Sequence, residues 1–214
     1  MRNSNPTKSV GILGAGKVGI VLAQLALKAG YTVYIAGSAD PKKIALTVKV
    51  LAPGAHAVSK EEAAMRADSI ILAIPLSKYA SLPKKELEGK LIIDTMNHWS
   101  EVDGPREDTV PETESSSAFI QEYLSDSIVI KALSHMGYHE LHDMHLPKGT
   151  SGRKAIAIAG DNDTAINEVS TFVDNLGFDP LYIGALKEGV ILEPGHKGFG
   201  TNFTKPELRK LLLG

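Results

Sequence analysis

A glycine-rich loop between an apolar run and a run of helix-forming residues is the feature that most restricts how this chain can fold. The apolar run covers Ser9–Gly14, the loop reads Gly14-Ala15-Gly16-Lys17-Val18-Gly19, and strong helix formers fill Ile20–Ala29. In such a loop the first glycine permits a tight turn, the second lets the backbone approach a pyrophosphate, and the third allows close packing of helix on strand. Because a strand precedes the loop and a helix follows it, the pattern predicts dinucleotide binding. A structural β–α turn without a ligand is the alternative.

Strands and helices alternate along the rest of the chain, which predicts an α/β fold with a doubly wound, mostly parallel Rossmann sheet. We expect a nucleotide-binding domain over residues 1–133 and a small α/β domain over residues 134–214. Polar residues and prolines between Asn97 and Ser117 predict a long surface loop, and a second loop is expected at residues 148–152. The strands are expected at residues 9–14, 31–36, 56–58, 69–74, 90–94, 127–132, 154–159 and 180–183, and the helices at 20–29, 42–50, 60–67, 118–124, 162–176 and from 205.

Composition excludes several classes of function. With 43% hydrophobic residues the chain can form a core, and a net charge of −2 gives no basic surface for nucleic acid. The absence of cysteine excludes disulfides, thiolate nucleophiles and Cys-ligated metal or iron–sulfur sites. Met1–Lys8 is polar, and the longest apolar stretches, 20–29 and 69–76, are far below the roughly 20 residues of a membrane span. We therefore expect a cytoplasmic protein that acts on a small molecule, without nucleic-acid or membrane partners.

The residues after the second predicted strand indicate which dinucleotide is preferred. An NAD site carries an acidic residue about 20 residues beyond the glycine loop, whereas Ala36-Gly37-Ser38-Ala39 contains none. Asp40 lies slightly late and suits a helix cap. Ser38 and the ammonium groups of Lys42 and Lys43 can instead bind a 2′-phosphate, which favours NADP. The alternative is that both lysines are ordinary solvated charges.

Further residues follow the other predicted parallel strands, whose carboxyl ends face the cofactor in this fold. They are Ala73-Ile74-Pro75, Asp94-Thr95-Met96-Asn97 and Lys131-Ala132-Leu133. Asn97 offers both donors and acceptors to a nicotinamide amide or a substrate. Taken singly, each of these residues is also explained by strand termination.

These segments together resemble the coenzyme F-420-dependent NADP oxidoreductases. The resemblance rests on the glycine loop, Gly37-Ser38, Ala73-Ile74-Pro75, Asp94–Asn97 and Lys131-Ala132, and extends to Ala155–Asp161 and to Glu193-Pro-Gly195 with Phe199-Gly200. It implies that the nicotinamide lies in a cleft between the two domains. It also implies a cofactor site formed by Gly14, Ala15, Gly16, Lys17, Val18, Gly19, Ser38, Ala73, Ile74, Pro75, Met96, Asn97 and Ala132. The family commonly places arginine after the serine, whereas this chain has Ala39, so Lys43 is the expected substitute for it.

The implied reaction is hydride transfer between NADP(H) and a second redox cofactor or small acceptor, with deazaflavin F-420 or a flavin as candidates. Such chemistry needs little help from side chains, because the cofactors supply it and the protein aligns them. Asn97 and His135 are the candidate catalytic residues. Two other functions stay open: a dinucleotide sensor without turnover, and a small-molecule dehydrogenase or imine reductase, which usually has a long helical C-terminal domain. A homodimer is expected on the base rate alone, because two-fold dimers are the commonest soluble oligomers.

Four histidines, His135, His139, His142 and His145, fall in one stretch with near-helical spacing. We expect no metal there, because Gly137 and Pro147 interrupt a long helix and hydride transfer needs no ion. Tyr138 with the first two histidines is expected near the nicotinamide, and His142 and His145 on the surface. Trp99 is interpreted equally as a core residue or as a stacking partner for a substrate ring. The cations Lys148, Arg153 and Lys154 either attract an acidic substrate tail or are solvated.

Overall fold

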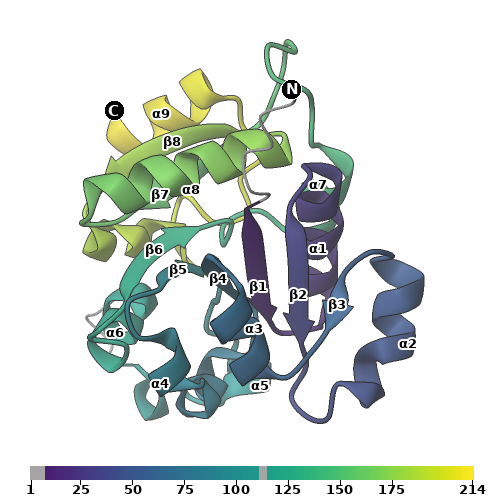
Figure 1. The fold of residues 1–214 in the computed structure, drawn as a ribbon. Helices are drawn as coiled ribbons and strands as arrows, with labels where there is room; N and C mark the ends of the chain where they lie inside the picture. The colour runs from purple at the N-terminus through teal and green to yellow at the C-terminus, as the bar shows by residue number, and fades with distance from the viewer. Residues whose placement is uncertain (1–7, 111–114) are drawn as a thin grey trace.

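One eight-stranded sheet forms the centre of the molecule (Figure 1). The structure, a computed structural model, describes residues 8–110 and 115–214. The strand order is β3-β2-β1-β4-β5-β6-β7-β8, and every neighbouring pair is parallel except β6 and β7. The first six strands have the order of a dinucleotide-binding Rossmann sheet, in which the chain reverses its direction of growth between β1 and β4. The predicted α/β, mostly parallel Rossmann class is confirmed.

The element bounds agree with the predicted ones to within a few residues at each end. The strands are β1 Ser9–Leu13, β2 Thr32–Ala36, β3 His56–Ala57, β4 Ser69–Leu72, β5 Leu91–Asp94, β6 Ile128–Ala132, β7 Ala155–Ala159 and β8 Asp179–Gly184. The α-helices are α1 Lys17–Lys28, α2 Lys42–Leu51, α3 Lys60–Arg66, α4 Lys84–Leu87, α5 Ser100–Asp103, α6 Ser116–Tyr123, α7 Tyr138–Asp143, α8 Asp163–Leu176 and α9 Lys205–Leu213. Short 3-10 helices cover Leu76–Ser81, Arg106–Asp108 and Leu186–Leu192.

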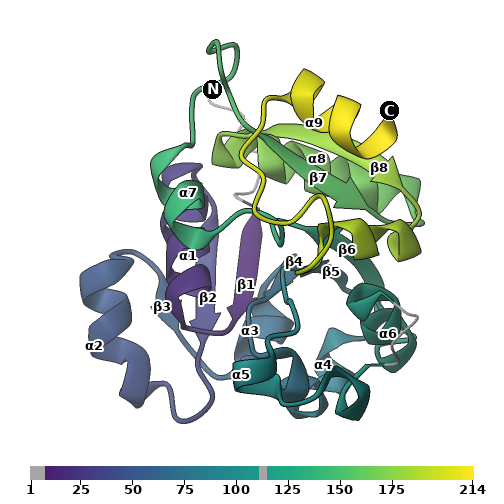
Figure 2. The ribbon, with the colours of Figure 1, turned by 180° about the vertical axis from the view of Figure 1, so that it is seen from behind.

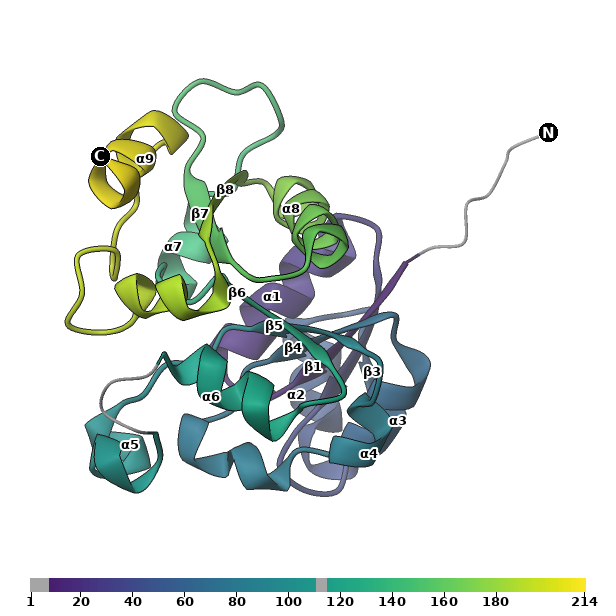
Figure 3. The ribbon, with the colours of Figure 1, turned by 90° about the vertical axis from the view of Figure 1, so that its left-hand side faces the viewer.

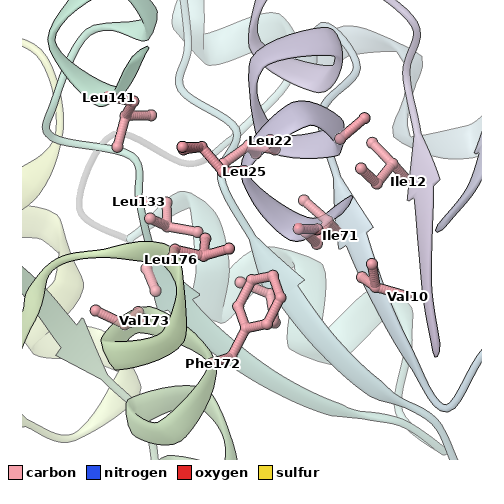
Figure 4. Packing of buried hydrophobic residues seen from close by; sticks show 14 of the residues in the cluster. Val10, Ile12, Leu22, Leu25, Ile71, Leu133, Leu141, Phe172, Val173 and Leu176 are labelled. Atoms are coloured by element: carbon pink, nitrogen blue, oxygen red, sulfur yellow. The ribbon is translucent and has the colours of Figure 1, made fainter. Parts of the chain in front are cut away.

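Helices cover both faces of the sheet, so the central strands are buried on both sides and consist of nearly continuous apolar residues. In Figure 3, α1 and α8 lie on one side of the sheet, and α3, α4 and α6 lie on the other. Figure 4 shows how α1 and α8 meet over the sheet: Leu22 and Leu25 of α1 and Phe172 of α8 lie close to Ile71 of β4. The opposite face buries Ile70, Leu72 and Ile92 against α3 and α6.

The C-terminal part continues the same sheet. Strand β7 pairs with β6 in an antiparallel manner at Lys131↔Ala159 and Ala132↔Ile158. Helices α8 and α9 cover opposite faces of β7 and β8, with Leu208 and Leu212 of α9 against Ala155 and Ala157 (Figure 2). This part is α/β, as expected. The domain boundary after residue 133 stays a prediction, since it falls where the chain leaves β6.

One expectation about the fold is corrected by the structure. The segment between Asn97 and Ser117 is not simply a surface loop, because it contains α5, a 3-10 turn and the start of α6. Four polar residues of this segment are buried: Asp103, Ser115, Ser116 and Ser117. Their burial is tolerated because each makes hydrogen bonds inside the protein. Residues 111–114 of this segment, and residues 1–7, lie outside the described residues. Within residues 8–110 and 115–214, the longest helices are too short or too polar to cross a membrane.

Candidate functional site

The glycine loop joins β1 to α1 with three glycines in three different environments. Gly14 has a φ of 130°, and a Cβ there would lie 2.1 Å from the Ala73 carbonyl oxygen. A Cβ at Gly19 would lie 1.8 Å from the carbonyl oxygen of Gly14. Gly16, the N-cap of α1, is exposed, and a Cβ there would meet no atom within 4 Å. The outer glycines are therefore required by packing, whereas Gly16 keeps open space in front of the helix N-terminus.

The ends of five strands form one row beside this loop. The Gly14 amide donates to the Ala36 carbonyl at 2.8 Å, which connects the loop to the end of β2. The Ala73 amide donates to the Leu13 carbonyl at 2.8 Å, and the Thr95 hydroxyl donates to the Leu72 carbonyl at 2.7 Å. Because β6 pairs with β5, Ala132 completes the row. The structure thus brings together the loop, Ala73-Ile74-Pro75, Met96-Asn97 and Ala132, as the sequence predicts.

The predicted residues of this row differ in accessibility. Gly16, Lys17 and Pro75 are exposed, and Ala15, Val18, Ala73, Ile74 and Asn97 are half-buried. Met96 and Ala132 are buried. Direct contact of the Met96 and Ala132 side chains with a cofactor stays a prediction.

The residues predicted for the 2′-phosphate lie after β2 and are accessible. Ser38 and Lys43 are both exposed, and Lys43 is in the first turn of α2. The Asp40 carboxylate accepts a hydrogen bond from the amide of Lys42, the first residue of α2, at 2.8 Å, although Pro41 and not Asp40 occupies the N-cap position. With Asp40 engaged in this way, the exposed groups that follow β2 are a hydroxyl and two ammonium groups, which suit an added phosphate.

Asn97 is held by the neighbouring strand end. Its Nδ2 donates to the Ser134 carbonyl at 2.7 Å, while its Oδ1 is buried and has no hydrogen-bond partner among the described residues. Between Ala132 and Ser134, the buried Leu133 has a φ of 62°, a conformation that costs a bulky residue about 1–3 kcal/mol. An acceptor atom left unpaired beside a strained backbone at the end of a strand is the arrangement expected of a ligand site.

A buried ion pair, to which we assigned no role from the sequence, contacts the backbone of Met96, the residue before Asn97. Lys131 and Asp94 are fully buried register partners of β6 and β5, and their charged atoms are 3.6 Å apart. The Lys131 ammonium donates to the Met96 carbonyl at 2.6 Å, and the Asp94 carboxylate accepts from the Met96 amide at 2.9 Å. A signal was present: two opposite charges each interrupt an apolar strand, at positions that parallel pairing brings together.

A second buried carboxylate connects the C-terminal segment to this layer. Glu193 follows the 3-10 helix Leu186–Leu192 and accepts hydrogen bonds from the Ser116 amide at 2.7 Å and the Ser116 hydroxyl at 3.0 Å. Its other oxygen accepts from the Arg106 guanidinium at 2.9 Å. Nearby, the Gly200 amide donates to the His135 carbonyl at 2.7 Å. The segment between β8 and α9 is therefore hydrogen-bonded to the connection between β5 and β6 and to His135, which follows β6.

His135 lies in a different environment from the one we expected. Its ring is fully buried, and its Nε2 accepts a hydrogen bond from the Ala157 amide of β7 at 3.0 Å. Burial lowers the pKa of His135 to about 4, and the nearby Thr201 backbone only partly opposes that shift, while the Nδ1 atom has no hydrogen-bond partner among the described residues. A neutral ring that is enclosed in this way does not face a substrate in this structure. The geometry thus argues against His135 as a catalytic residue.

The other histidines of the stretch lie on or near the short helix α7. His139 and His142 are exposed. His145 is not a free surface residue, because its ring contacts the Lys28 ammonium at 2.6 Å and the His142 carbonyl at 2.7 Å. Among the described residues, no group of three or more His, Asp or Glu side chains is placed to hold a metal.

Tyr138 and His139 lie beside the glycine loop. The Lys17 ammonium is 5.3 Å from the centre of the Tyr138 ring, and both residues border a pocket of about 560 Å³. The remaining lining residues come from the loop, α1, α2 and α7, and include Gly16, Gln24, Thr47 and His139. A larger pocket, of about 860 Å³, lies at the opposite edge, where the strands begin. The smaller pocket meets the predicted cofactor residues only at Ala15, Gly16 and Lys17, and none of the predicted residues at the ends of β2, β4, β5 and β6 lines it.

Two further expectations change. Trp99 is 45% exposed and contacts Phe199 edge-to-face at 5.6 Å, so it is not a core residue, and stacking on a substrate ring stays a prediction. Arg153 is neither solvated nor available to an acidic ligand. It is buried and bonded to Asp174 and Asp179, each at 2.7 Å.

Residues 9–98 match the family described as NADP oxidoreductase coenzyme F420-dependent. This segment contains the glycine loop, Ser38, Lys43, Ala73–Pro75 and Met96-Asn97. Over these residues the resemblance inferred from the sequence is confirmed, because they match the model of an NADP-dependent oxidoreductase family.

Three proteins are similar to this chain over most of its length, with sequence identities below 30%. The rat Metalloreductase STEAP3 is 28% identical over 181 residues, which are 83% of this chain and 34% of that protein. The chain thus spans about a third of the length of this relative. The solved structure of the hypothetical protein SMa0349 from Sinorhizobium meliloti has a TM-score of 0.79 at 24% identity, covering 93% of this chain and 96% of the other. A protein of Arthrobacter sp. FB24, suggested to be an F420-dependent NADP-reductase, has a TM-score of 0.70 at 22% identity, covering 85% and 86%.

Proposed function

We propose that this chain binds NADP(H) along the row of strand ends and transfers a hydride between the nicotinamide and a second redox carrier. The observation that carries the proposal is the glycine loop, in which two glycines are fixed by packing and the third, Gly16, leaves open space at the N-terminus of α1. Backbone amides at such a helix end attract a pyrophosphate. The residues present therefore fit a dinucleotide.

The two ends of the cofactor are assigned from the strand ends. Ser38 and Lys43 would bind the 2′-phosphate of the adenosine half. Asn97 would bind the nicotinamide half, because its Oδ1 is an unpaired acceptor suited to a carboxamide N–H. When bound, NADPH supplies a hydride, and the chain has to align it with the acceptor and exclude water.

The acceptor is proposed by class. The matching family favours deazaflavin F-420, and a flavin is the second candidate for the hydride acceptor. The similarity to a metalloreductase adds ferric chelates, which take up single electrons and would be reduced through such a flavin and not by direct hydride transfer. The edge formed by Trp99 and Phe199 offers aromatic surface next to Asn97, which suits a planar ring. A ring that accepts a hydride also takes up a proton, so two electrons and one proton leave NADPH with the hydride and one proton comes from solvent.

The test is a titration followed by an acceptor screen. Purified protein is titrated with NADPH and NADH by calorimetry, and NADPH oxidation is then followed with F-420, FMN, ferric chelates and quinones. Turnover with one acceptor class is expected. Absence of binding by either nucleotide would overturn the proposal. Tight NADPH binding without turnover of any acceptor would favour a dinucleotide sensor.

Replacement of Ser38 and Lys43 by alanine tests the phosphate site. The double variant is expected to bind NADPH about tenfold more weakly or worse, because it loses one hydroxyl contact and one charge-assisted contact. NADH affinity is expected to change less than about twofold, since NADH lacks the phosphate. Calorimetric titration of each nucleotide measures the ratio.

Lys49→Ala is the matched control, because Lys49 is an exposed lysine in the last turn of the same helix. It removes the same charge at the other end of α2 and should leave both affinities unchanged. Equal losses of NADPH and NADH affinity in the Ser38/Lys43 variant would show that the 2′-phosphate lies elsewhere.

A further inference from the structure

We propose that the buried pair Asp94–Lys131 is a positioning device for the nicotinamide half of the cofactor, acting through the backbone of Met96 and the side chain of Asn97. The inference rests on the proposed function and adds to it a pair of residues that never touch the ligand. It starts from the parallel register of β5 and β6, which places Asp94 and Lys131 side by side at the last positions of the shared ladder.

The two charges hold Met96 at both of its backbone groups. The Asp94 carboxylate accepts from the Met96 amide at 2.9 Å, while the Lys131 ammonium donates to the Met96 carbonyl at 2.6 Å. The other oxygen of Asp94 accepts from the Ser117 hydroxyl, and the Lys131 ammonium also lies 3.3 Å from the Ser116 hydroxyl. The chain that leaves β5 is thereby fixed in direction at the residue before Asn97.

The position of Asn97 depends on the fixed backbone of Met96, which precedes it. Its Nδ2 donates to the Ser134 carbonyl at 2.7 Å, two residues beyond the end of β6, so the amide plane is held from β5 and from β6 together. With Nδ2 engaged, Oδ1 is the acceptor left without a partner among the described residues. It is buried in this structure, so a ligand reaches it by displacing a neighbouring group. A rotation of the Met96–Asn97 peptide would redirect that acceptor.

A buried ion pair is a costly way to hold a peptide in place, because apolar residues of the same volume stabilise a core as well or better. Lys131 is fully buried, and its stem packs against Gly189, where a Cβ would lie 3.2 Å from the lysine Cγ. The pair therefore gains little for folding that leucine or methionine would not provide. Its distinct contribution is directional, since only a donor at Lys131 and an acceptor at Asp94 fix both groups of Met96.

The test separates the two halves of the cofactor. Lys131→Met keeps the length of the side chain and removes the donor. Its affinity is measured by calorimetry for NADPH and for 2′,5′-ADP, which carries the adenosine half and the 2′-phosphate without nicotinamide. We expect NADPH affinity to fall about tenfold, the worth of one neutral hydrogen bond, and 2′,5′-ADP affinity to stay within about twofold.

Two further variants control for damage to the fold. Arg153→Met breaks a buried charge cluster at Asp174 and Asp179, away from the strand ends, and should lower the Tm without changing the ratio of the two affinities. If Lys131→Met does not fold, the double variant Lys131→Met/Asp94→Asn removes both charges. It is expected to show the same loss of NADPH affinity with little change in 2′,5′-ADP affinity. Asn97→Ala should also weaken the binding of NADPH and not that of 2′,5′-ADP. Combined with Lys131→Met, it should lower NADPH affinity little further, because the two residues act in one chain of contacts.

Equal loss of both ligands, or unchanged NADPH affinity in a folded Lys131 variant, would overturn the positioning role. A failure of the proposed function is recognised separately, because the unaltered protein would then bind neither NADPH nor 2′,5′-ADP.

Discussion

Gly19→Ala is expected to destabilise the protein by about 3 kcal/mol or more, a loss that leaves little folded material in a domain of ordinary stability. Gly19 lies in the first turn of α1, where alanine would normally stabilise a helix by about 1 kcal/mol. The sign is reversed here, because the added Cβ would lie 1.8 Å from the carbonyl oxygen of Gly14. That atom belongs to a buried turn and cannot retreat. Urea unfolding of both proteins measures the difference.

Gly16→Ala is the matched control on the same loop. A Cβ at Gly16 meets no atom within 4 Å, so the free energy of unfolding should change by less than about 1 kcal/mol. NADPH affinity should nevertheless fall more than about tenfold, because the methyl group fills the space through which a pyrophosphate approaches the helix N-terminus. A Gly19 variant as stable as the unaltered protein, or a Gly16 variant with full affinity, would contradict this division of roles.

The sequence was sufficient to predict the fold and the row of strand ends, because both depend on local patterns. Apolar runs closed by Gly14, Pro75 and Asn97 mark strands that end at a crevice, and parallel pairing then brings those ends together. The contact of Asp40 with the start of α2 could be predicted from its place before a proline, although the N-cap position itself is that of Pro41. These inferences need no knowledge of which side chains meet across the sheet.

What could not be predicted depends on long-range contacts. The role of Lys131 follows from its register with Asp94, and the role of Glu193 follows from its contact with Ser116, 77 residues earlier. His135 was interpreted as a substrate-facing group because it follows a strand end. Its burial results from β7, which pairs antiparallel to β6 and brings the Ala157 amide to the ring. Nothing local to residues 131–139 indicates that pairing.

The stability of the protein is expected to fall by about 3 kcal/mol between pH 6.5 and pH 4 through His135 alone. Burial lowers the pKa of this histidine from 6.5 to about 4 in the folded state. Between these values the unfolded chain binds a proton that the folded chain excludes, so unfolding is favoured as the pH falls. Well above pH 6.5 both states are neutral at this site, and its contribution is constant. The full difference of about 2.5 pKa units at 1.36 kcal/mol each is about 3.4 kcal/mol, of which about 2.6 kcal/mol is lost between pH 6.5 and pH 4.

His135→Gln isolates this contribution from that of the carboxylates, which titrate in the same range. The variant should lose about 1 kcal/mol at pH 7, since the bond from the Ala157 amide is weakened, and should then show a flatter dependence on pH. Near pH 4 the order is expected to reverse, with the variant the more stable protein. His142→Gln, a change at an exposed histidine of α7, should follow the unaltered protein throughout. Urea unfolding at pH 7, 5.5 and 4.5 measures all three. If the free energies of unfolding of His135→Gln and of the unaltered protein change in parallel with pH, the ring takes up a proton in the folded state near pH 6.5. A group that faces the cofactor cleft would do so, and His135 would again be a candidate for catalysis.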